Sequence, residues 1–154
     1  MATNRKVCII VSHGGLDEVY PALILANGAR MEGIDCVLFF TFYGLDAITE
    51  DKVDSLHVNM VGNPTSPVPT ILMGLPGMET MAAKMMQSKM TDLDLPNARE
   101  MLEILHEAGA EIYGCLLAMD MFGRTKDDLM PVVKDVITVG DFYDMSEGAQ
   151  IIFT

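Results

Sequence analysis

The sequence predicts an α/β protein with three layers, in which helices cover both faces of a mostly parallel five-stranded sheet. Two observations lead to this prediction. Short apolar segments rich in β-branched residues recur along the chain, and segments with helical patterns separate them. An alternation of strand and helix favours parallel pairing through right-handed crossovers, with helices on both faces of the sheet.

The first elements are a strand and a long helix. Lys6–Val11 is continuously apolar apart from its first residue, as expected of a strand buried on both faces. Ser12–Gly15 ends this strand. Leu16–Met31 then has apolar residues around most of a helical circumference, so we expect a heavily buried helix that Gly33 terminates.

The next part contains one further strand and three helical segments. Asp35–Thr41 reads as a second buried strand, and Leu45–Asp51 as a short helix. Residues 52–76 are rich in Gly and Pro, and a loop of this length is often functional or mobile. The sequence leaves open whether it forms a lid or an interface. We expect helices over Gly77–Met90 and Asn97–Gly109, the second capped by Asn97.

The helix over Gly77–Met90 is unusually rich in methionine. Its methionines are Met78, Met81, Met85, Met86 and Met90. Methionine fills irregular gaps in cores and also forms adaptable partner surfaces, so both interpretations carry similar weight.

Three more strands complete the predicted sheet. Glu111–Leu116 is the third strand, and residues 119–130 are partly helical. Val136–Val139 is the fourth strand, a short helix extends to Gly148, and Gln150–Phe153 is the fifth strand.

Composition narrows the possible functions. The 154 residues fit a single domain spanning 1–154, and the net charge of −12 opposes binding to nucleic acid. No segment has the length and apolarity of a secretory signal or a membrane span, so we expect a cytoplasmic protein. The three cysteines and three histidines show no ligand spacing, so we expect no metal site.

The residues that could take part in binding or catalysis lie at the strand ends, because ligands bind outside the carboxyl ends of strands in open α/β sheets. Cys115 lies at the end of the third strand. The sequence is equally consistent with a buried core residue and with a reactive thiol at this position. Cys8 and Cys36 lie inside apolar strands and read as inert core. Asp120 would hold or repel a charge beside Cys115, or cap the following segment.

The turn after the first strand is the second candidate. His13 would act as a base, orient an anion, or simply satisfy the turn. Ser12-His13-Gly14-Gly15 has the glycines of a phosphate-binding turn but not the complete motif. His57 and His106 receive no functional role.

Four stretches of the chain resemble one known family. They are Ala26-Asn27-Gly28-Ala29, Leu38 to Leu45, the Met- and Gly-rich residues 73–90, and Ile112 to Gly123 with Cys115 and Met119-Asp120. With them the chain resembles the DsrE/DsrF-like sulfur-relay proteins, in the branch described as DsrE-type or peroxiredoxin-like sulfurtransferases. The resemblance implies a flavodoxin-like fold, homo- or hetero-oligomers, and a cysteine that carries sulfur as a persulfide. Cys115 matches that cysteine by position.

The resulting hypothesis is a sulfur carrier without a cofactor that relays sulfane sulfur between donor and acceptor proteins. His13 and loop amides, including that of Gly14, would stabilise the charged sulfur. The residues expected to border or shield the site are Phe42, Tyr43, Gly44, Met119 and Asp120. The alternative is a module that binds a nucleotide or another small anion in the same cleft, or that only assembles. A peroxidase would need an external thiol, because no resolving cysteine is near Cys115 in sequence.

Overall fold

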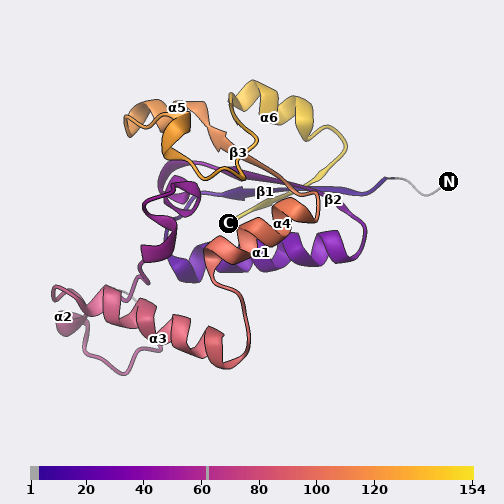
Figure 1. Cartoon of the computed structure of the whole chain (residues 1–154). Helices are drawn as coiled ribbons and strands as arrows, with labels where there is room; N and C mark the ends of the chain where they lie inside the picture. Colours follow the sequence, from indigo (N-terminus) through magenta and orange to yellow (C-terminus); the bar gives the residue numbers. More distant parts are fainter. Residues whose placement is uncertain (1–3, 62) are drawn as a thin grey trace.

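A sheet of five parallel strands forms the centre of the computed structural model, which describes residues 4–61 and 63–154 (Figure 1). The strands are β1 (Lys6–Val11), β2 (Asp35–Phe40), β3 (Glu111–Cys115), β4 (Asp135–Ile137) and β5 (Gln150–Phe153). Their order is β4-β3-β2-β1-β5, and each neighbouring pair is parallel. This order differs from the 2-1-3-4-5 of flavodoxin, but in both the direction of winding reverses beside β1.

Helices cover both faces of the sheet, which confirms the predicted three layers (Figure 1). The helices α1 (Leu16–Met31) and α4 (Ala98–Glu107) lie on one face, and α5 (Leu116–Met121) and α6 (Val139–Met145) lie on the other. Ile9, Leu38 and Ile112 from the central strands are fully buried. The rings of Phe39 and Phe142 stack with centroids 4.8 Å apart, which holds α6 against β2.

Capping boxes begin two of the helices. The Asn97 side chain accepts a hydrogen bond from the Glu100 amide at 2.9 Å, which confirms the predicted cap of α4. Thr138 and Asp141 form the equivalent box at α6. The predicted fourth strand over Val136–Val139 is therefore wrong at its end: Thr138 caps a helix, and β4 stops at Ile137.

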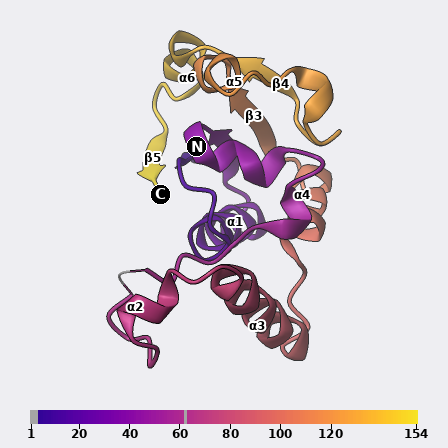
Figure 2. The same ribbon diagram turned by 90° about the vertical axis from the view of Figure 1, so that its left-hand side faces the viewer.

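In its described residues, the connection from β2 to β3 contains four helical segments before α4. They are the 3-10 helices η1 (Phe42–Ile48) and η2 (Val53–Ser55), followed by α2 (Thr70–Met73) and α3 (Met78–Asp92). The predicted helix over Leu45–Asp51 thus begins and ends earlier than expected, since the chain turns at Phe42 directly after β2. Figure 2 shows α2 and α3 beneath α1, outside the three layers.

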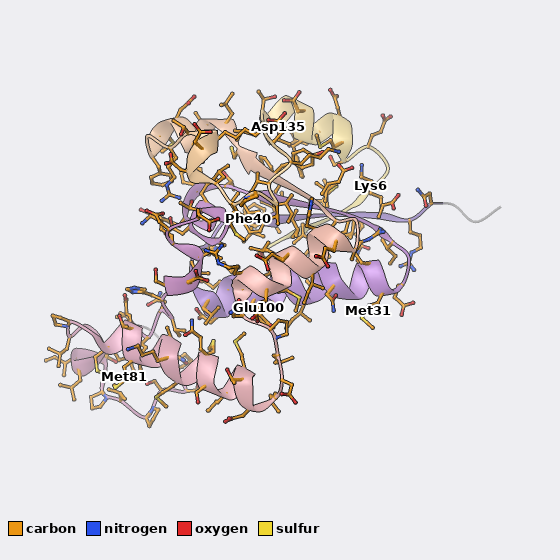
Figure 3. The ribbon with its side chains drawn as sticks, in the orientation of Figure 1. Lys6, Met31, Phe40, Met81, Glu100 and Asp135 are labelled. Atoms are coloured by element: carbon orange, nitrogen blue, oxygen red, sulfur yellow. The ribbon has the colours of Figure 1, made fainter. Side chains whose placement is uncertain are left out.

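The apolar residues of α1 and α3 divide between core and surface. Met81 is 50 % exposed, whereas Met90 is 8 % exposed, so α3 uses methionine for both roles. Figure 3 shows Phe40 inside the layers and Met81 on the outlying α3. On α1, Ile24 and Leu25 are 53 % and 46 % exposed, so this helix is less buried than its sequence predicts.

Candidate functional site

The loops after β1 and β2 pack so closely that two glycines are required between them. A Cβ on Gly44 would lie 2.1 Å from the Val11 carbonyl oxygen, and a Cβ on Gly14 would lie 2.5 Å from the Tyr43 carbonyl oxygen. Both atoms belong to the backbone, so no side-chain rotation relieves the clash. Phe42 turns the chain out of β2 with a φ of 48°, in the left-handed region that rarely suits a bulky residue.

These two loops form one wall of a pocket of about 600 Å³ at the carboxyl edge of the sheet, which we call the edge pocket. Three predicted site residues line it: His13, Gly14 and Tyr43. Its other lining residues are Gly15, Glu18, Asp46, Lys52, Ser55, Leu56, His57, Asn59 and Glu79. The pocket therefore joins the sheet edge to the first turn of the outlying helix α3.

The charges of the edge pocket are mixed. Its carboxylates are Glu18, Asp46 and Glu79, and its basic groups are Lys52 and two imidazoles. The His57 Nδ1 lies 3.4 Å from the Glu79 Oε2, which links residues 52–59 to α3. Such a site does not have the positive excess that would favour a phosphate group.

The start of α1 is also occupied by the chain's own groups. The Leu16 amide donates a hydrogen bond to the His57 carbonyl at 2.8 Å. Asp17 and Glu18 place carboxylates in the first turn of the helix, where they offset its positive end. The two carboxylates beside the glycine turn therefore disfavour a phosphate group at the start of α1.

Hydrogen bonds join the ends of β1 and β5, where the winding of the sheet reverses. The Ser12 hydroxyl donates to the Thr154 carbonyl at 2.8 Å, and the Ser12 amide donates to the same oxygen at 3.1 Å. The Thr154 hydroxyl donates to the Ile10 carbonyl at 2.8 Å. Ser12 therefore connects the end of β1 to the end of β5 by hydrogen bonds.

Cys115 lies at a different corner of the same edge, at the junction of β3 and α5. It is the last residue of β3 and the N-cap of α5, and it is 4 % exposed. A Cβ on the preceding Gly114 would contact Leu45, Ile48 and Leu129 at 3.6 Å, so η1 packs against this corner. The thiol is buried and does not line the edge pocket.

Side chains connect η1 to the turn after α5. The rings of Tyr43 and Phe122 lie with centroids 5.5 Å apart, and the Arg124 guanidinium lies 5.5 Å from the Phe122 centroid. Arg124 also pairs with Asp46 and donates to the Thr49 hydroxyl at 3.0 Å. These residues, which we call the corner clasp, join the edge pocket to the Cys115 corner.

The other two cysteines match their prediction as buried residues. Burial raises the pKa of the Cys36 thiol to about 12, and burial also raises the pKa of Cys8. Cys36 pairs with Val7, and Cys8 pairs with Val37, in the parallel register of β1 and β2. Successive strand residues point to opposite faces, so these two thiols face away from each other.

The predicted site residues thus separate into groups. His13, Gly14 and Tyr43 meet in the edge pocket, with Gly44 buried behind them. Cys115 and Met119 are buried at the β3–α5 corner, while Phe42 and Asp120 are exposed.

Sequence reasoning missed the contributions of His57, Glu79 and Arg124. His57 and Glu79 reach the carboxyl edge from segments far along the chain from any strand end, and Arg124 reaches it from the turn after α5, so no local pattern marks them. The fold of residues 52–59 and the position of α3 bring His57 and Glu79 to the pocket that His13 lines.

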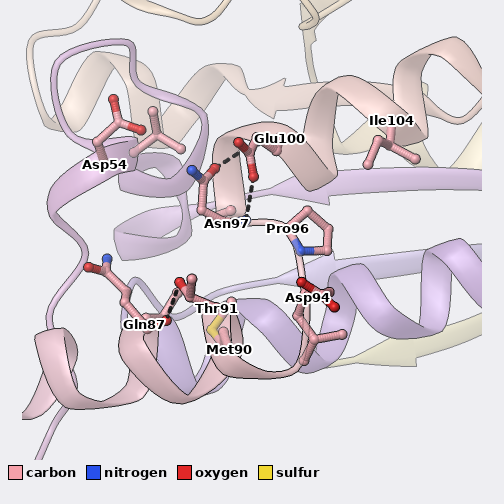
Figure 4. A pocket seen from close by; sticks show the side chains of 13 residues that line it. Asp54, Gln87, Met90, Thr91, Asp94, Pro96, Asn97, Glu100 and Ile104 are labelled. Carbon is pink, nitrogen blue, oxygen red and sulfur yellow. Dashed lines mark hydrogen bonds between the residues drawn. The ribbon is translucent and has the colours of Figure 1, made fainter.

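A cavity of about 680 Å³ lies elsewhere, between α3, η2 and the start of α4 (Figure 4). Its polar groups include the Asn97 and Glu100 of the capping box, and Thr91, whose hydroxyl donates to the Gln87 carbonyl at 3.0 Å. These polar groups already form hydrogen bonds with neighbouring residues of the chain. We therefore interpret the cavity as a packing gap between α3 and the three layers of the fold.

Metal and membrane sites receive no support from the part of the chain that the structure describes. Within residues 4–61 and 63–154, no group of three or more His, Cys, Asp or Glu residues is placed to hold a metal ion. None of the helices described there has the length and apolarity needed to cross a membrane.

Comparison with known proteins places the chain among sulfur-relay relatives. The profile of the DsrE/DsrF/DrsH-like family matches residues 3–153. The sulfur carrier protein DsrE2 of Allochromatium vinosum is 33 % identical over 139 residues, which cover 85 % of this chain and 86 % of that protein. YrkE of Bacillus subtilis is 22 % identical over 158 residues, covering 97 % of both chains.

Solved structures support the fold. MTH1491 from Methanobacterium thermoautotrophicum superposes with a TM-score of 0.61 at 14 % identity, over 97 % of this chain and 99 % of that one. The ychN protein of E. coli superposes with a TM-score of 0.59 at 15 % identity, over 99 % and 100 % of the two chains. Identities this low carry the α/β architecture and nothing further.

Proposed function

The chain belongs to the DsrE/DsrF/DrsH-like family, and we propose that it is a sulfur carrier whose Cys115 holds sulfane sulfur as a persulfide. The observation that carries the proposal is the 33 % identity to a sulfur carrier protein over most of both chains. Donor and acceptor are separate proteins in this proposal, and the carrier works as a homo-oligomer in the cytoplasm. Its acidic surface favours partners with a basic docking patch.

The position of the three cysteines supports Cys115 as the carrier. Cys115 ends β3 at the carboxyl edge, while Cys8 and Cys36 lie within strands that are covered on both faces. Burial keeps the Cys36 thiol protonated by raising its pKa to about 12, and a thiol is a much weaker nucleophile than a thiolate.

The transfer is an exchange between a thiolate and a persulfide. The Cys115 thiolate attacks the outer sulfur of a donor persulfide, so a new S–S bond forms at Cys115 and the donor S–S bond breaks. The donor leaves as a thiolate, and the proton of the outer sulfur moves with that sulfur. An acceptor thiolate then repeats the attack on Cys115, and no external oxidant or reductant is consumed.

Exposure of the Cys115 thiol is a required step, because the side chain is buried at rest. The elements around it are short: α5 runs only from Leu116 to Met121, and η1 is a 3-10 helix. Local opening costs less free energy at such elements than at the central strands. In this proposal, displacement of the corner clasp by a docking donor uncovers the thiol.

The test is the intact mass of the reductant-free protein after incubation with sodium polysulfide, followed by peptide mapping. We expect a gain of about 32 Da, one sulfur atom, located on the peptide that contains Cys115. Cys115→Ser should remove the gain and keep the far-UV circular dichroism unchanged. Cys36→Ala is the matched control, since it removes a thiol and should keep the loading. Equal loading of Cys115→Ser and the wild type would refute the assignment.

The edge pocket favours a second candidate, a module that binds a small ligand. The pocket includes His13, Gly14 and Tyr43 but not Cys115, so it is able to act without the thiol. A thermal shift measured with ADP and with inorganic phosphate separates the two functions. A stabilisation by either ligand that His13→Ala abolishes would favour the module. Unchanged melting temperatures together with sulfur loading favour the carrier.

A further inference from the structure

The two edges of the sheet are protected very differently. At one edge, β4 has only three residues, Asp135–Ile137, and charges surround it. Lys126 pairs with Asp135 at 3.2 Å, and Lys134 pairs with Glu111 at 3.1 Å. A short, charged edge strand opposes pairing with another chain.

At the other edge, β5 has none of these protections. Its residues Gln150–Phe153 include no charge, no proline and no bulge. In the described residues its backbone pairs only with β1. Charged residues make up 21 % of the chain, but β5 has none of them. This edge strand is therefore open to pairing with another strand.

The outward backbone groups of β5 can be identified from the ladder. Thr154 donates its amide to the Ile10 carbonyl and accepts from the Ser12 amide, so it bonds to β1 through both groups. Residues alternate in a parallel ladder, so Ile152 also faces β1. The amides and carbonyls of Ile151 and Phe153 therefore point away from the sheet.

Apolar side chains on both faces of β5 are also left uncovered. On one face, Ile151 and Phe153 are 47 % and 69 % exposed. On the other face, Ile152 lines a groove of about 550 Å³ beside the exposed Ile24 and Leu25 of α1. Parallel sheets normally bury both faces of their strands, so this edge lacks a neighbour.

We propose that the missing neighbour is a second copy of this chain, which pairs its own β5 antiparallel to this β5 around a two-fold axis. An edge of this kind is self-complementary: Ile151 and Phe153 of each strand offer both donors and acceptors to the same residues of the other. The result is a continuous ten-strand sheet, twice the five strands of one chain.

The rest of the surface fits the same occupant. A two-fold axis perpendicular to the sheet keeps both α1 helices on the same face, so Ile24 and Leu25 of each copy lie across the groove from their counterparts.

The charges around the groove also favour a second copy as the occupant. The net charge of −12 makes copies repel, but Arg5 and Lys6 border this groove with Glu32 as its one carboxylate. The groove is thus less acidic than the chain as a whole, which lowers the repulsion between copies at this edge.

Light scattering coupled to size exclusion at tens of micromolar protein tests the proposal. The wild type should have an even number of chains, with a dimer at twice 16.8 kDa as the simplest case. Ile151→Lys and Phe153→Lys should each halve the mass, because a buried unpaired lysine is costly at an interface. Ile71→Lys is the matched control: Ile71 is 85 % exposed on α2, and its replacement should leave the mass unchanged.

Hydrogen exchange provides a second readout that does not depend on side-chain changes. The Ile151 and Phe153 amides should be protected in the wild type and should exchange rapidly in both lysine variants. The variants should keep the wild-type circular dichroism, since both side chains are exposed in a single chain. A monomeric wild type, or a mass unaffected by both lysines, would overturn the proposal. This interface rests on the homo-oligomer of the proposed function, so a monomeric wild type would refute both of these. Sulfur loading of Cys115 is measured separately and tests the carrier role alone.

Discussion

At the scale of single residues, the three cysteines differ in environment in a way that chemistry can report. Cys115 is buried at a corner built from short elements, whereas Cys36 is buried within a strand and has a pKa of about 12. Iodoacetamide reacts with thiolates that are accessible, so both thiolate fraction and local opening set its rate.

We expect the native protein to be alkylated at Cys115 first, at least about 10-fold more slowly than free cysteine because opening must precede reaction. Cys8 and Cys36 should react only on global unfolding. Mass spectrometry of peptides sampled over time gives each rate. Preferential labelling of Cys36 in the folded protein would contradict this assignment of environments.

Glu111 makes the stability of the fold depend on acidic pH. The Tyr113 hydroxyl donates to the Glu111 carboxylate at 2.6 Å, and this bond, with Lys134 adding to it, lowers the pKa of Glu111 against the opposing effect of burial. A lowered pKa in the folded state means that the contribution is complete above the ordinary value of 4.5 and is lost as pH falls through the folded-state value.

Glu111→Gln should therefore lower the free energy of unfolding at pH 7 by less than about 1 kcal/mol, because the carboxylate is partly exposed and water screens it. The difference between variant and wild type should shrink as pH falls below about 4.5. Urea unfolding at a series of pH values measures it, with the exposed Glu103→Gln as control. A difference that stays constant down to pH 3 would exclude Glu111 as its source.

At the scale of elements, the methionine-rich helix α3 combines core and surface positions. Met90 is 8 % exposed, whereas Met81 is 50 % exposed on the same helix. Burial decides the energetic role of a methionine, since its removal from a packed site leaves a cavity.

Met90→Ala should cost about 2–3 kcal/mol of unfolding free energy, whereas Met81→Gln should change it by less than about 0.5 kcal/mol. Urea denaturation with a fixed slope provides the comparison. Equal losses at the two positions would mean that Met81 is covered in solution, as it would be by a bound partner.

Most elements could be predicted from local sequence because one dominant signal defines each of them. The continuous apolar run of Lys6–Val11 and the cap at Asn97 are such signals, and both elements have the expected bounds or start. Val139 illustrates the limit: an apolar residue after Ile137 extends a strand by composition, but the Thr138–Asp141 capping box starts a helix there.

At the scale of the whole molecule, the sheet edge was predictable and the site was only partly so. Parallel strands bring His13, Tyr43 and Cys115 to one edge by topology alone. Burial of Cys115 and the contribution of His57 to the edge pocket depend on how η1 and residues 52–59 lie against that edge. A long irregular connection has no periodicity from which such a path can be read.

The position of β5 has a consequence for how the chain folds during synthesis. β5 pairs with β1, as in Cys8 beside Ile151, so β1 has only one neighbouring strand until β5 has been synthesised. At 5–20 residues per second, the ribosome needs roughly 7–28 s to extend the chain from β1 to β5. Throughout that interval one side of β1 is an open apolar template, and this is the period in which a nascent chain most needs protection by chaperones.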